Sequence, residues 1–163
     1  MAGIRIYETP IRAEWIDYNG HLRDAYYTLI LSDATDALMD RVGLDAAYRA
    51  RTGGTLYTLE MHLHFLREVK QTDTVLVDVR ILGVDRKRIH AAFEILRAGD
   101  AGAAATAEIM LLHVRQEHGK VSTAPFPPEV AARLGELASA SAALEAAGPG
   151  SRRMQLRPPG EPA

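Results

Sequence analysis

A carboxylate and a histidine lie four residues apart in a polar stretch that is placed to do chemistry. Asp17 is followed by Asn19, Gly20 and His21, and a helical pattern begins directly after them. Such a carboxylate can activate water as a general base, or attack a carbonyl carbon to form a short-lived anhydride. Amide N–H groups at the start of the helix can stabilise negative charge on the carbonyl oxygen. The sequence predicts a loop-plus-helix site led by Asp17.

Each loop residue also has an ordinary structural interpretation. Asp17 can hydrogen-bond the backbone of its own loop, as many aspartates before helices do. His21 can orient substrate or water, but it can equally bond locally. Asn19 can hold the nucleophilic water or simply permit the turn, and we favour the turn. Gly20 allows the backbone to come close to a ligand.

Two elements flank the loop. Residues 4–14 alternate loosely between apolar and polar, which predicts a first strand carrying Pro10 where no ladder hydrogen bond is needed. After the loop, Asp24 is the candidate N-cap of a helix, and apolar residues recur at helical spacing until Gly43 supplies a stop. The opposite side of this long helix is expected to be a solvated face carrying Asp33, Asp36 and Asp40.

Four strands are expected after the helix. Residues 57–65 alternate strictly, with apolar side chains at odd positions and polar ones at even positions, which is typical of a half-buried strand. Residues 75–81 and 89–95 predict a hairpin with a turn at 83–86. The fifth strand is expected over residues 103–115.

The remaining sequence completes a single domain. An alanine-rich helix is expected over residues 129–146, and residues 148–163, rich in Gly, Pro and Arg, are expected to be a mobile tail after a domain spanning 1–147. Consecutive antiparallel strands can wrap around one helix so that the apolar stripe of the helix fills their concave face. The expected fold class is therefore α+β.

The loop also resembles a known family motif. Residues 15–27 (WIDYNGHLRDAYY) are similar to the Asp-x-x-Gly-His-x-Asn loop of hot-dog thioesterases related to 4-hydroxybenzoyl-CoA thioesterase, and residues 65–69 (FLREV) resemble the Tyr-Leu-Arg-Pro segment of that family. The resemblance covers roughly residues 4–115. Three further stretches, together with residues 15–21, look like the betainyl-CoA thioesterases of carnitine breakdown: residues 48–53, 59–62 and 110–114.

This resemblance implies both the fold and the activity. The fold would be a hot-dog fold, an antiparallel sheet of about five strands wrapped around one long helix. The activity would be hydrolysis of an acyl-CoA, most closely betainyl-CoA, to the free acid and CoA. No cofactor is implied, because coenzyme A is part of the substrate. Hot-dog subunits pair, so a homodimer is expected, with a tetramer as a further assembly.

The resemblance also extends the candidate site. Since hot-dog active sites lie between subunits, Glu60 on the polar face of its strand is a second candidate, as a base, as an orienting group for Asp17 or as a counter-charge to a cationic acyl group. Alternatively, Glu60 is a solvent-facing strand carboxylate without a role in the site. A betainyl group carries a quaternary ammonium, which aromatic faces recognise. The candidate rings, all of which could instead be core, are Trp15, Tyr18, Tyr26 and Tyr57.

Basic residues and histidines supply the remaining candidates. The CoA phosphates need cations, and the densest basic cluster outside the tail is Arg86, Lys87 and Arg88, which could also be merely solvated. His62 and His64 share a strand face at a spacing that can chelate zinc, but no further ligand set accompanies them. We therefore expect no metal.

Composition narrows the remaining possibilities. The absence of cysteine excludes disulfides, thiolate metal sites and cysteine nucleophiles, and fits a reducing compartment. With 19 basic and 21 acidic residues, the chain has no overall field that would collect nucleic acid. No stretch approaches the ~20 apolar residues that span a bilayer. A cytoplasmic protein that binds neither nucleic acid nor membrane is expected.

Two other functions remain open on the same fold. Residues 17–21 are similar to the Asp-x-Asn-Pro-x-His loop of hot-dog enoyl-CoA hydratases, although the proline is missing and the Asp-to-His interval is one residue shorter. A non-catalytic acyl-CoA-binding protein would keep the pocket without needing a base. Such regulators generally carry a DNA-binding segment, and none is visible in this sequence.

Overall fold

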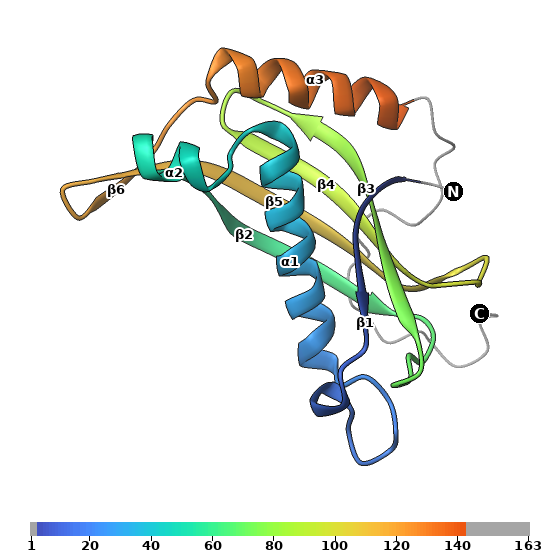
Figure 1. Cartoon of the computed structure of the whole chain (residues 1–163). Helices are drawn as coiled ribbons and strands as arrows, with labels where there is room; N and C mark the ends of the chain where they lie inside the picture. The colour runs from blue at the N-terminus through green and yellow to red at the C-terminus, as the bar shows by residue number, and fades with distance from the viewer. Residues whose placement is uncertain (1–2, 143–163) are drawn as a thin grey trace, which may run out of the picture.

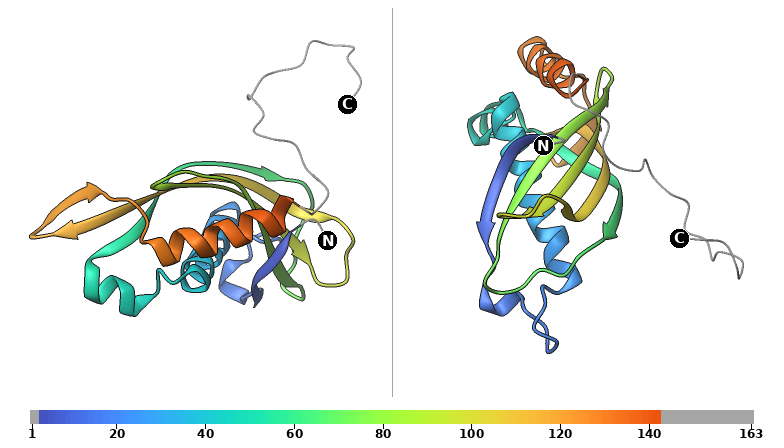
Figure 2. Two further views of the ribbon diagram at one scale, coloured as in Figure 1. Left: turned by 90° about the horizontal axis from the view of Figure 1, so that it is seen from above. Right: turned by 90° about the vertical axis from the view of Figure 1, so that its right-hand side faces the viewer.

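A long helix lies in the hollow of a curved antiparallel sheet, with the edge strands β1 and β2 on either side of it (Figures 1 and 2). The structure is a computed structural model that describes residues 3–142. The helix is α1 (Asp24–Val42), and the strands run in the order β1-β3-β4-β5-β2, with β6 paired to β5. The strand bounds are β1 Ile4–Pro10, β2 Gly54–Phe65, β3 Thr74–Val84, β4 Arg88–Arg97, β5 Ala103–Glu117 and β6 Lys120–Thr123. The expected α+β architecture is confirmed, with β6 as an additional short strand.

The core lies between α1 and the concave face of the sheet. Alternate residues of β4 are buried, as expected for a strand with one face covered, and Phe93 is fully inaccessible. On α1, Ile30, Leu31 and Leu38 are also fully inaccessible. Truncating one such leucine to alanine typically costs about 2–5 kcal/mol. This packing fixes the helix axis, and with it the position of the loop before the helix.

Two further α-helices complete the fold. The first, α2 (Ala46–Thr52), joins α1 to β2, and Asp45 caps it by accepting a hydrogen bond from the Tyr48 N–H at 2.8 Å. The second, α3 (Pro128–Ala142), packs along β3, where the Ser141 hydroxyl accepts a hydrogen bond from the Ile81 N–H at 3.0 Å. The last expected helical residues (143–146), the end of the 1–147 domain and the tail at 148–163 lie outside the described residues. No helix within residues 3–142 has the length and hydropathy needed to cross a membrane.

The first strand is shorter than expected. It ends at Pro10, opposite Thr74, and residues 13–15 form a 3₁₀ helix, η1 (Ala13–Trp15), instead of continuing the ladder. The turn buries the Trp15 ring, which is only 4 % exposed, and this burial explains why the strand stops early. The chain therefore enters the candidate loop from a helical turn.

Of the two predicted ends of α1, the C-terminal end is confirmed and the N-cap is wrong. Gly43 ends the helix in the left-handed conformation, with φ 88°, as expected. Asp24, however, is not the N-cap: Arg23 occupies that position with an extended backbone and no side-chain cap. Asp24 is the first helical residue, and its Oδ1 accepts a hydrogen bond from the Ala25 N–H at 2.8 Å.

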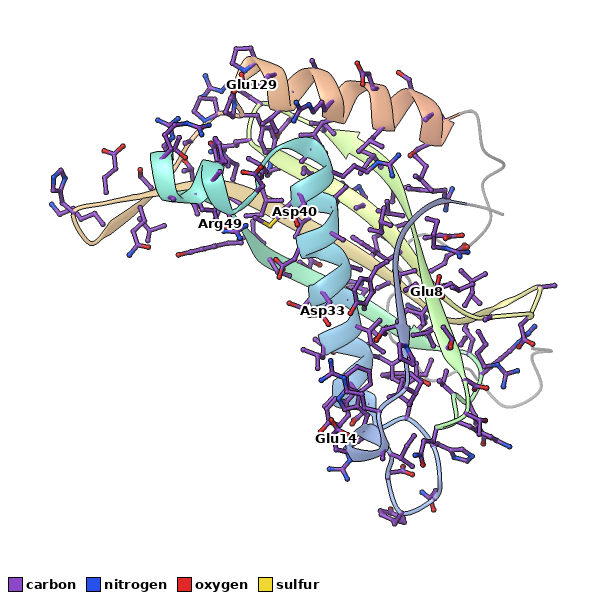
Figure 3. All side chains as sticks on the ribbon, in the orientation of Figure 1. Glu8, Glu14, Asp33, Asp40, Arg49 and Glu129 are labelled. Atoms are coloured by element: carbon purple, nitrogen blue, oxygen red, sulfur yellow. The ribbon has the colours of Figure 1, made fainter. Side chains whose placement is uncertain are left out.

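The acidic side of α1 is not uniformly solvated. Asp33 and Asp40 lie on the same helix (Figure 3), yet only Asp40 and Asp36 are exposed. Asp33 is partly buried against β1, where it accepts a hydrogen bond from the Tyr7 hydroxyl at 3.1 Å. The expectation of a fully solvated face is therefore wrong at Asp33, because the sheet curls around the helix far enough to reach it.

The strict alternation expected over residues 57–65 is interrupted. The pairing of β2 with β5 shifts register between Thr58 and Glu60, which is a β-bulge. Tyr57 and Leu59 are consequently 44 % and 55 % exposed, although the alternation had placed both on the apolar face. Only beyond the bulge does the strand return to the expected pattern, with Met61 packed on the core.

Candidate functional site

The loop that carries Asp17 is held by its own carboxylate. The Asp17 Oδ1 accepts hydrogen bonds from the backbone N–H groups of Asn19 at 2.8 Å and His21 at 3.2 Å. Gly20 adopts φ 81°, a conformation that favours glycine, and a Cβ at that position would meet nothing within 4 Å. Glycine is therefore required here by the turn and not by close approach of another part of the chain. Asn19 likewise serves the turn through its backbone.

The same hydrogen bonds favour the charged form of the Asp17 carboxylate. The His21 N–H, the largest influence, and the Asn19 N–H hold the pKa of Asp17 below its ordinary value of 3.8, against a smaller opposing effect of burial. The Asn19 side chain also hydrogen-bonds the Asp17 carboxylate and lowers its pKa further. An ionised carboxylate can act on a water or on a carbonyl carbon.

The start of α1, seven residues after Asp17, supplies a hydrogen-bond donor. The Ala25 N–H is taken up by the Asp24 side chain, but the Asp24 N–H has no acceptor in the described part of the chain. Arg23 provides no side-chain cap. A free N–H at the positive end of a 19-residue helix is suited to an oxygen that gains negative charge.

The loop borders a pocket between α1 and the end of β2. Its volume is about 380 Å³. The loop is tied to the segment after β2 by the Leu22 N–H, which donates to the Val69 carbonyl at 2.7 Å, and by His21 Nε2, which lies 3.0 Å from Glu68 Oε2. The pocket is lined by His21, Leu22, Asp24, Tyr27, Phe65, Leu66, Arg67 and Glu68.

The four aromatic candidates do not meet at one point in the described chain. Trp15 is buried and stacks on Tyr26, with ring centroids 5.6 Å apart, and the Arg12 guanidinium lies over its ring at 5.0 Å. Tyr18 is 96 % exposed at the tip of the loop. Tyr57 lies on β2, beyond the bulge from this loop. Trp15 and Tyr26 therefore anchor the loop to the helix.

Glu60 lies apart from Asp17 in this chain. It pairs with Met110 of β5, whose neighbours Ile109 and Leu111 face the core, so Glu60 is on the sheet face opposite α1. Its Oε1 is 2.8 Å from His62 Nε2. Glu60 borders a second pocket, of about 200 Å³, lined by Glu60, His62, His90, Glu108, Ile109 and Met110.

A second histidine–carboxylate pair in that pocket was missed from the sequence. His90 Nε2 lies 2.5 Å from Glu108 Oε1, and the two residues come from different strands. Their pairing follows from the β4–β5 register, in which His90 is opposite Met110 and Glu108 is opposite Ala92. Within residues 3–142 no group of three or more side chains is arranged to hold a metal ion, and His64 joins no such group.

The basic cluster lies at the far end of the sheet from Asp17. Arg88 is opposite Leu112, which in turn is opposite Tyr57 on β2. Tyr57 precedes the end of β2 by eight residues, or about 25 Å of strand. The side chains of the cluster also have partners: Arg88 forms an ion pair with Asp85 at 2.7 Å, and Lys87 Nζ lies 3.5 Å from the Thr123 hydroxyl. Arg86 is exposed beside them.

The candidate residues therefore form two separate groups. The first surrounds the start of α1 and contains Asp17, Asn19, Gly20 and His21, with Trp15, Tyr18 and Tyr26 around them. The second lies on the opposite sheet face and at the β3–β4 turn, and contains Tyr57, Glu60, Arg86, Lys87 and Arg88. The pocket residues Tyr27, Phe65 and Glu68 were not singled out from sequence, because only the fold brings the end of β2 against the loop.

Comparison with known proteins assigns the chain to a family. The model of the Thioesterase-like superfamily matches residues 11–134. The betainyl-CoA thioesterase of Pseudomonas aeruginosa is 51 % identical over 138 residues, which cover 85 % of this chain and 86 % of that protein. The L-carnitine dehydrogenase/betainyl-CoA thioesterase of Rhizobium meliloti is 38 % identical over 143 residues, covering 88 % of this chain but only 28 % of that longer protein.

A solved structure agrees with these sequence matches. The crystal structure of a proposed thioesterase from Pseudomonas putida KT2440 superposes with a TM-score of 0.85 and is 42 % identical, covering 97 % of this chain and 99 % of that one. The hot-dog arrangement of a long helix inside an antiparallel sheet is thus shared along nearly the whole length. On the family match and these relatives, the chain belongs to the Thioesterase-like superfamily of hot-dog proteins.

Proposed function

We propose that this protein is an acyl-CoA thioesterase that hydrolyses betainyl-CoA to glycine betaine and CoA. The observation that carries the reaction type is a carboxylate held ionised by the N–H groups of His21 and Asn19, in the loop that leads into α1, whose first N–H has no acceptor within residues 3–142. The choice of acyl group is supported by the 51 % identity to the betainyl-CoA thioesterase of Pseudomonas aeruginosa. Coenzyme A enters as part of the substrate, and the proposal needs no cofactor.

Asp17 is the proposed catalytic carboxylate. As a base, it takes a proton from a water whose oxygen adds to the thioester carbonyl carbon; the C–S bond of the tetrahedral intermediate then breaks, and the CoA thiolate leaves and takes up a proton. As a nucleophile, its oxygen adds to that carbon, the C–S bond breaks to release CoA, and water hydrolyses the resulting anhydride. Both routes place negative charge on the carbonyl oxygen, where the Asp24 N–H can donate a hydrogen bond. His21 is proposed to position the loop, since its N–H bonds Asp17 and its ring contacts Glu68.

A homodimer paired along β2 is part of the proposal. β2 is an edge strand of the described sheet, and it exposes three large apolar side chains: Tyr57, Leu59 and Phe65, at 44 %, 55 % and 55 %. An uncovered apolar edge favours pairing with another strand. Two-fold symmetry makes the paired strands antiparallel, so the start of the partner's β2 lies beside the end of this one.

Such pairing would bring the basic cluster of one chain toward the Asp17 loop of the other. In one chain, the cluster of Arg86, Lys87 and Arg88 and the Asp17 loop are at opposite ends of the sheet. The antiparallel partner carries its own basic cluster toward this chain's loop. That arrangement supports a role for these cations in binding the CoA phosphates. A tetramer would require a further contact between dimers. A cytoplasmic location is proposed from the CoA substrate and the cysteine-free sequence.

A thiol-release assay tests the proposed function. Purified protein is incubated with betainyl-CoA and with neutral short-chain, aromatic and long-chain acyl-CoAs, and free CoA thiol is measured. We expect the highest kcat/KM for betainyl-CoA. Thiol release from another acyl-CoA but not from betainyl-CoA would overturn the proposed substrate assignment. Binding of acyl-CoA without any thiol release would favour the non-catalytic alternative. A change in enoyl absorbance without thiol release would favour the hydratase.

A further inference from the structure

We propose that the pocket between α1 and the end of β2 binds the quaternary ammonium of the acyl group, with Phe65 and Tyr27 as aromatic surfaces and Glu68 as the counter-charge. This inference rests on the proposed function, because it assigns the acyl subsite of that reaction. It also replaces the aromatic set expected from sequence, whose members lie apart in the fold.

The pocket has the chemistry that a quaternary ammonium requires. Such a cation cannot donate hydrogen bonds, so it is bound by ring faces and nearby negative charge. The rings of Tyr27 and Phe65 meet edge to face, with centroids 5.1 Å apart. Tyr27 is buried, whereas Phe65 is 55 % exposed and can present its face to a ligand. The volume of about 380 Å³ exceeds the needs of a trimethylammonium group.

The charges that line the pocket also favour a cation. Two carboxylates, those of Asp24 and Glu68, border it. The one guanidinium in the lining, that of Arg67, has a carboxylate partner outside the lining: its Nη1 lies 4.0 Å from Asp100 Oδ2. His21 touches Glu68 but leaves that side chain 65 % exposed. Glu68 is therefore accessible to a bound cation.

The length of the substrate selects this pocket over the one at Glu60. In a betainyl group a single methylene separates the carbonyl carbon from the nitrogen, so the cation must bind within a few ångströms of the reacting carbonyl. The pocket at Glu68 includes Asp24, whose N–H is the proposed donor to the carbonyl oxygen. Glu60 is on the opposite face of the sheet, separated from α1 by the core. We therefore assign the counter-charge to Glu68.

An isosteric substrate pair tests the assignment. In 3,3-dimethylbutanoyl-CoA a carbon replaces the nitrogen of betainyl-CoA, so that the shape is kept and the charge is lost. The ratio of kcat/KM values, betainyl over neutral, measures recognition of the charge. We expect this ratio to fall about 3- to 30-fold in Phe65→Leu and in Glu68→Gln, the range that corresponds to one cation–π or exposed charge contact. Far-UV circular dichroism checks that both variants fold.

Two further variants make the test specific. Glu129→Gln removes an exposed carboxylate on α3, at the end of the molecule remote from Glu14 and the start of α1 (Figure 3), and should leave the ratio unchanged. Glu60→Gln removes the competing carboxylate. A ratio that stays at the wild-type value in Phe65→Leu and Glu68→Gln, or that falls in Glu60→Gln instead, overturns the assignment while leaving the proposed function intact.

Binding of the product separates the two proposals if turnover fails. Should wild-type protein release no thiol from betainyl-CoA, the proposed function is wrong, and the pocket is judged by titration with glycine betaine followed by NMR. Saturable binding that weakens in Phe65→Leu and Glu68→Gln supports the pocket. Absence of saturable binding to wild-type protein, or equal binding to all variants, overturns it.

Discussion

The substitution Tyr48→Phe removes one hydrogen bond from a buried pair without opening a cavity. The Tyr48 hydroxyl lies 2.9 Å from His113 Nε2, and His113 Nδ1 lies 2.9 Å from the Ala124 carbonyl oxygen. Because that oxygen only accepts, Nδ1 carries the proton and Nε2 accepts from Tyr48. His113 is fully inaccessible, so in Tyr48→Phe its Nε2 is left as a buried acceptor without a partner.

The expected cost follows from that geometry. An unpaired buried acceptor costs roughly 1–3 kcal/mol, and the retained ring keeps its packing against His113. We therefore expect a loss of about 2 kcal/mol in unfolding free energy, or about 4–8 °C in Tm for a chain of this size. Urea unfolding can be followed by the fluorescence of Trp15, the one tryptophan, at fixed protein concentration. Tyr18→Phe, at a 96 % exposed ring, is the matched control and should change stability by less than about 0.5 kcal/mol.

The same pair predicts a pH dependence. Burial lowers the pKa of His113 below its ordinary value of 6.5. Below pH 6.5 the unfolded chain then binds a proton at this residue that the folded chain does not, so the unfolding free energy falls as the pH decreases from 6.5 toward the folded pKa. The decrease should be smaller in His113→Gln. Wild-type stability in Tyr48→Phe, or a wild-type pH slope in His113→Gln, would refute the reasoning.

Three further predictions concern the loop and the strand edge. Gly20→Ala forces alanine into φ 81° and should lower kcat/KM by distorting the Asp17 turn. The control Gly99→Ala imposes a similar strain at φ 90° in the β4–β5 turn and should leave turnover unchanged. Equal kcat/KM values for the two variants would contradict this prediction. Leu59→Asp should shift the protein from dimer to monomer in sedimentation, and an unchanged mass would argue against pairing at β2. The N–H bonds of the loop lower the pKa of Asp17, so the decrease of kcat/KM at acidic pH that is due to Asp17 should occur below pH 3.8, as long as the protein stays folded. A decrease centred above pH 5 that disappears when Asp17 is substituted would contradict the environment described for this carboxylate.

Sequence predicts best the elements whose pattern is local. The long helix and its stop at Gly43 follow from spacing and from the freedom of glycine, and both are confirmed. The β3–β4 hairpin is likewise confirmed, since its strands are neighbours along the chain. The bulge between Thr58 and Glu60 has no such local pattern, because it depends on the register against β5. The placement of Tyr57 and Leu59 on the apolar face failed for that reason.

The candidate site also has a part that sequence predicts and a part that it does not. Residue types and spacing identified the Asp17 loop, because its turn chemistry and the following helix are contiguous. The pocket could not be predicted, since Phe65 and Glu68 reach the loop only through the packing of β2 and through contacts such as His21 with Glu68. The pair of His90 with Glu108 also needs the β4–β5 register. Long-range pairing, which sequence periodicity does not specify, decides which side chains meet.

Turnover of betainyl-CoA by Asp17→Asn tests the central claim most directly. Asparagine keeps an oxygen that can accept the N–H groups of Asn19 and His21, so the loop should be preserved while the negative charge is lost. We expect kcat/KM to fall by about 100-fold or more, with unchanged circular dichroism. A folded variant that releases thiol at a rate within about threefold of wild type would contradict it.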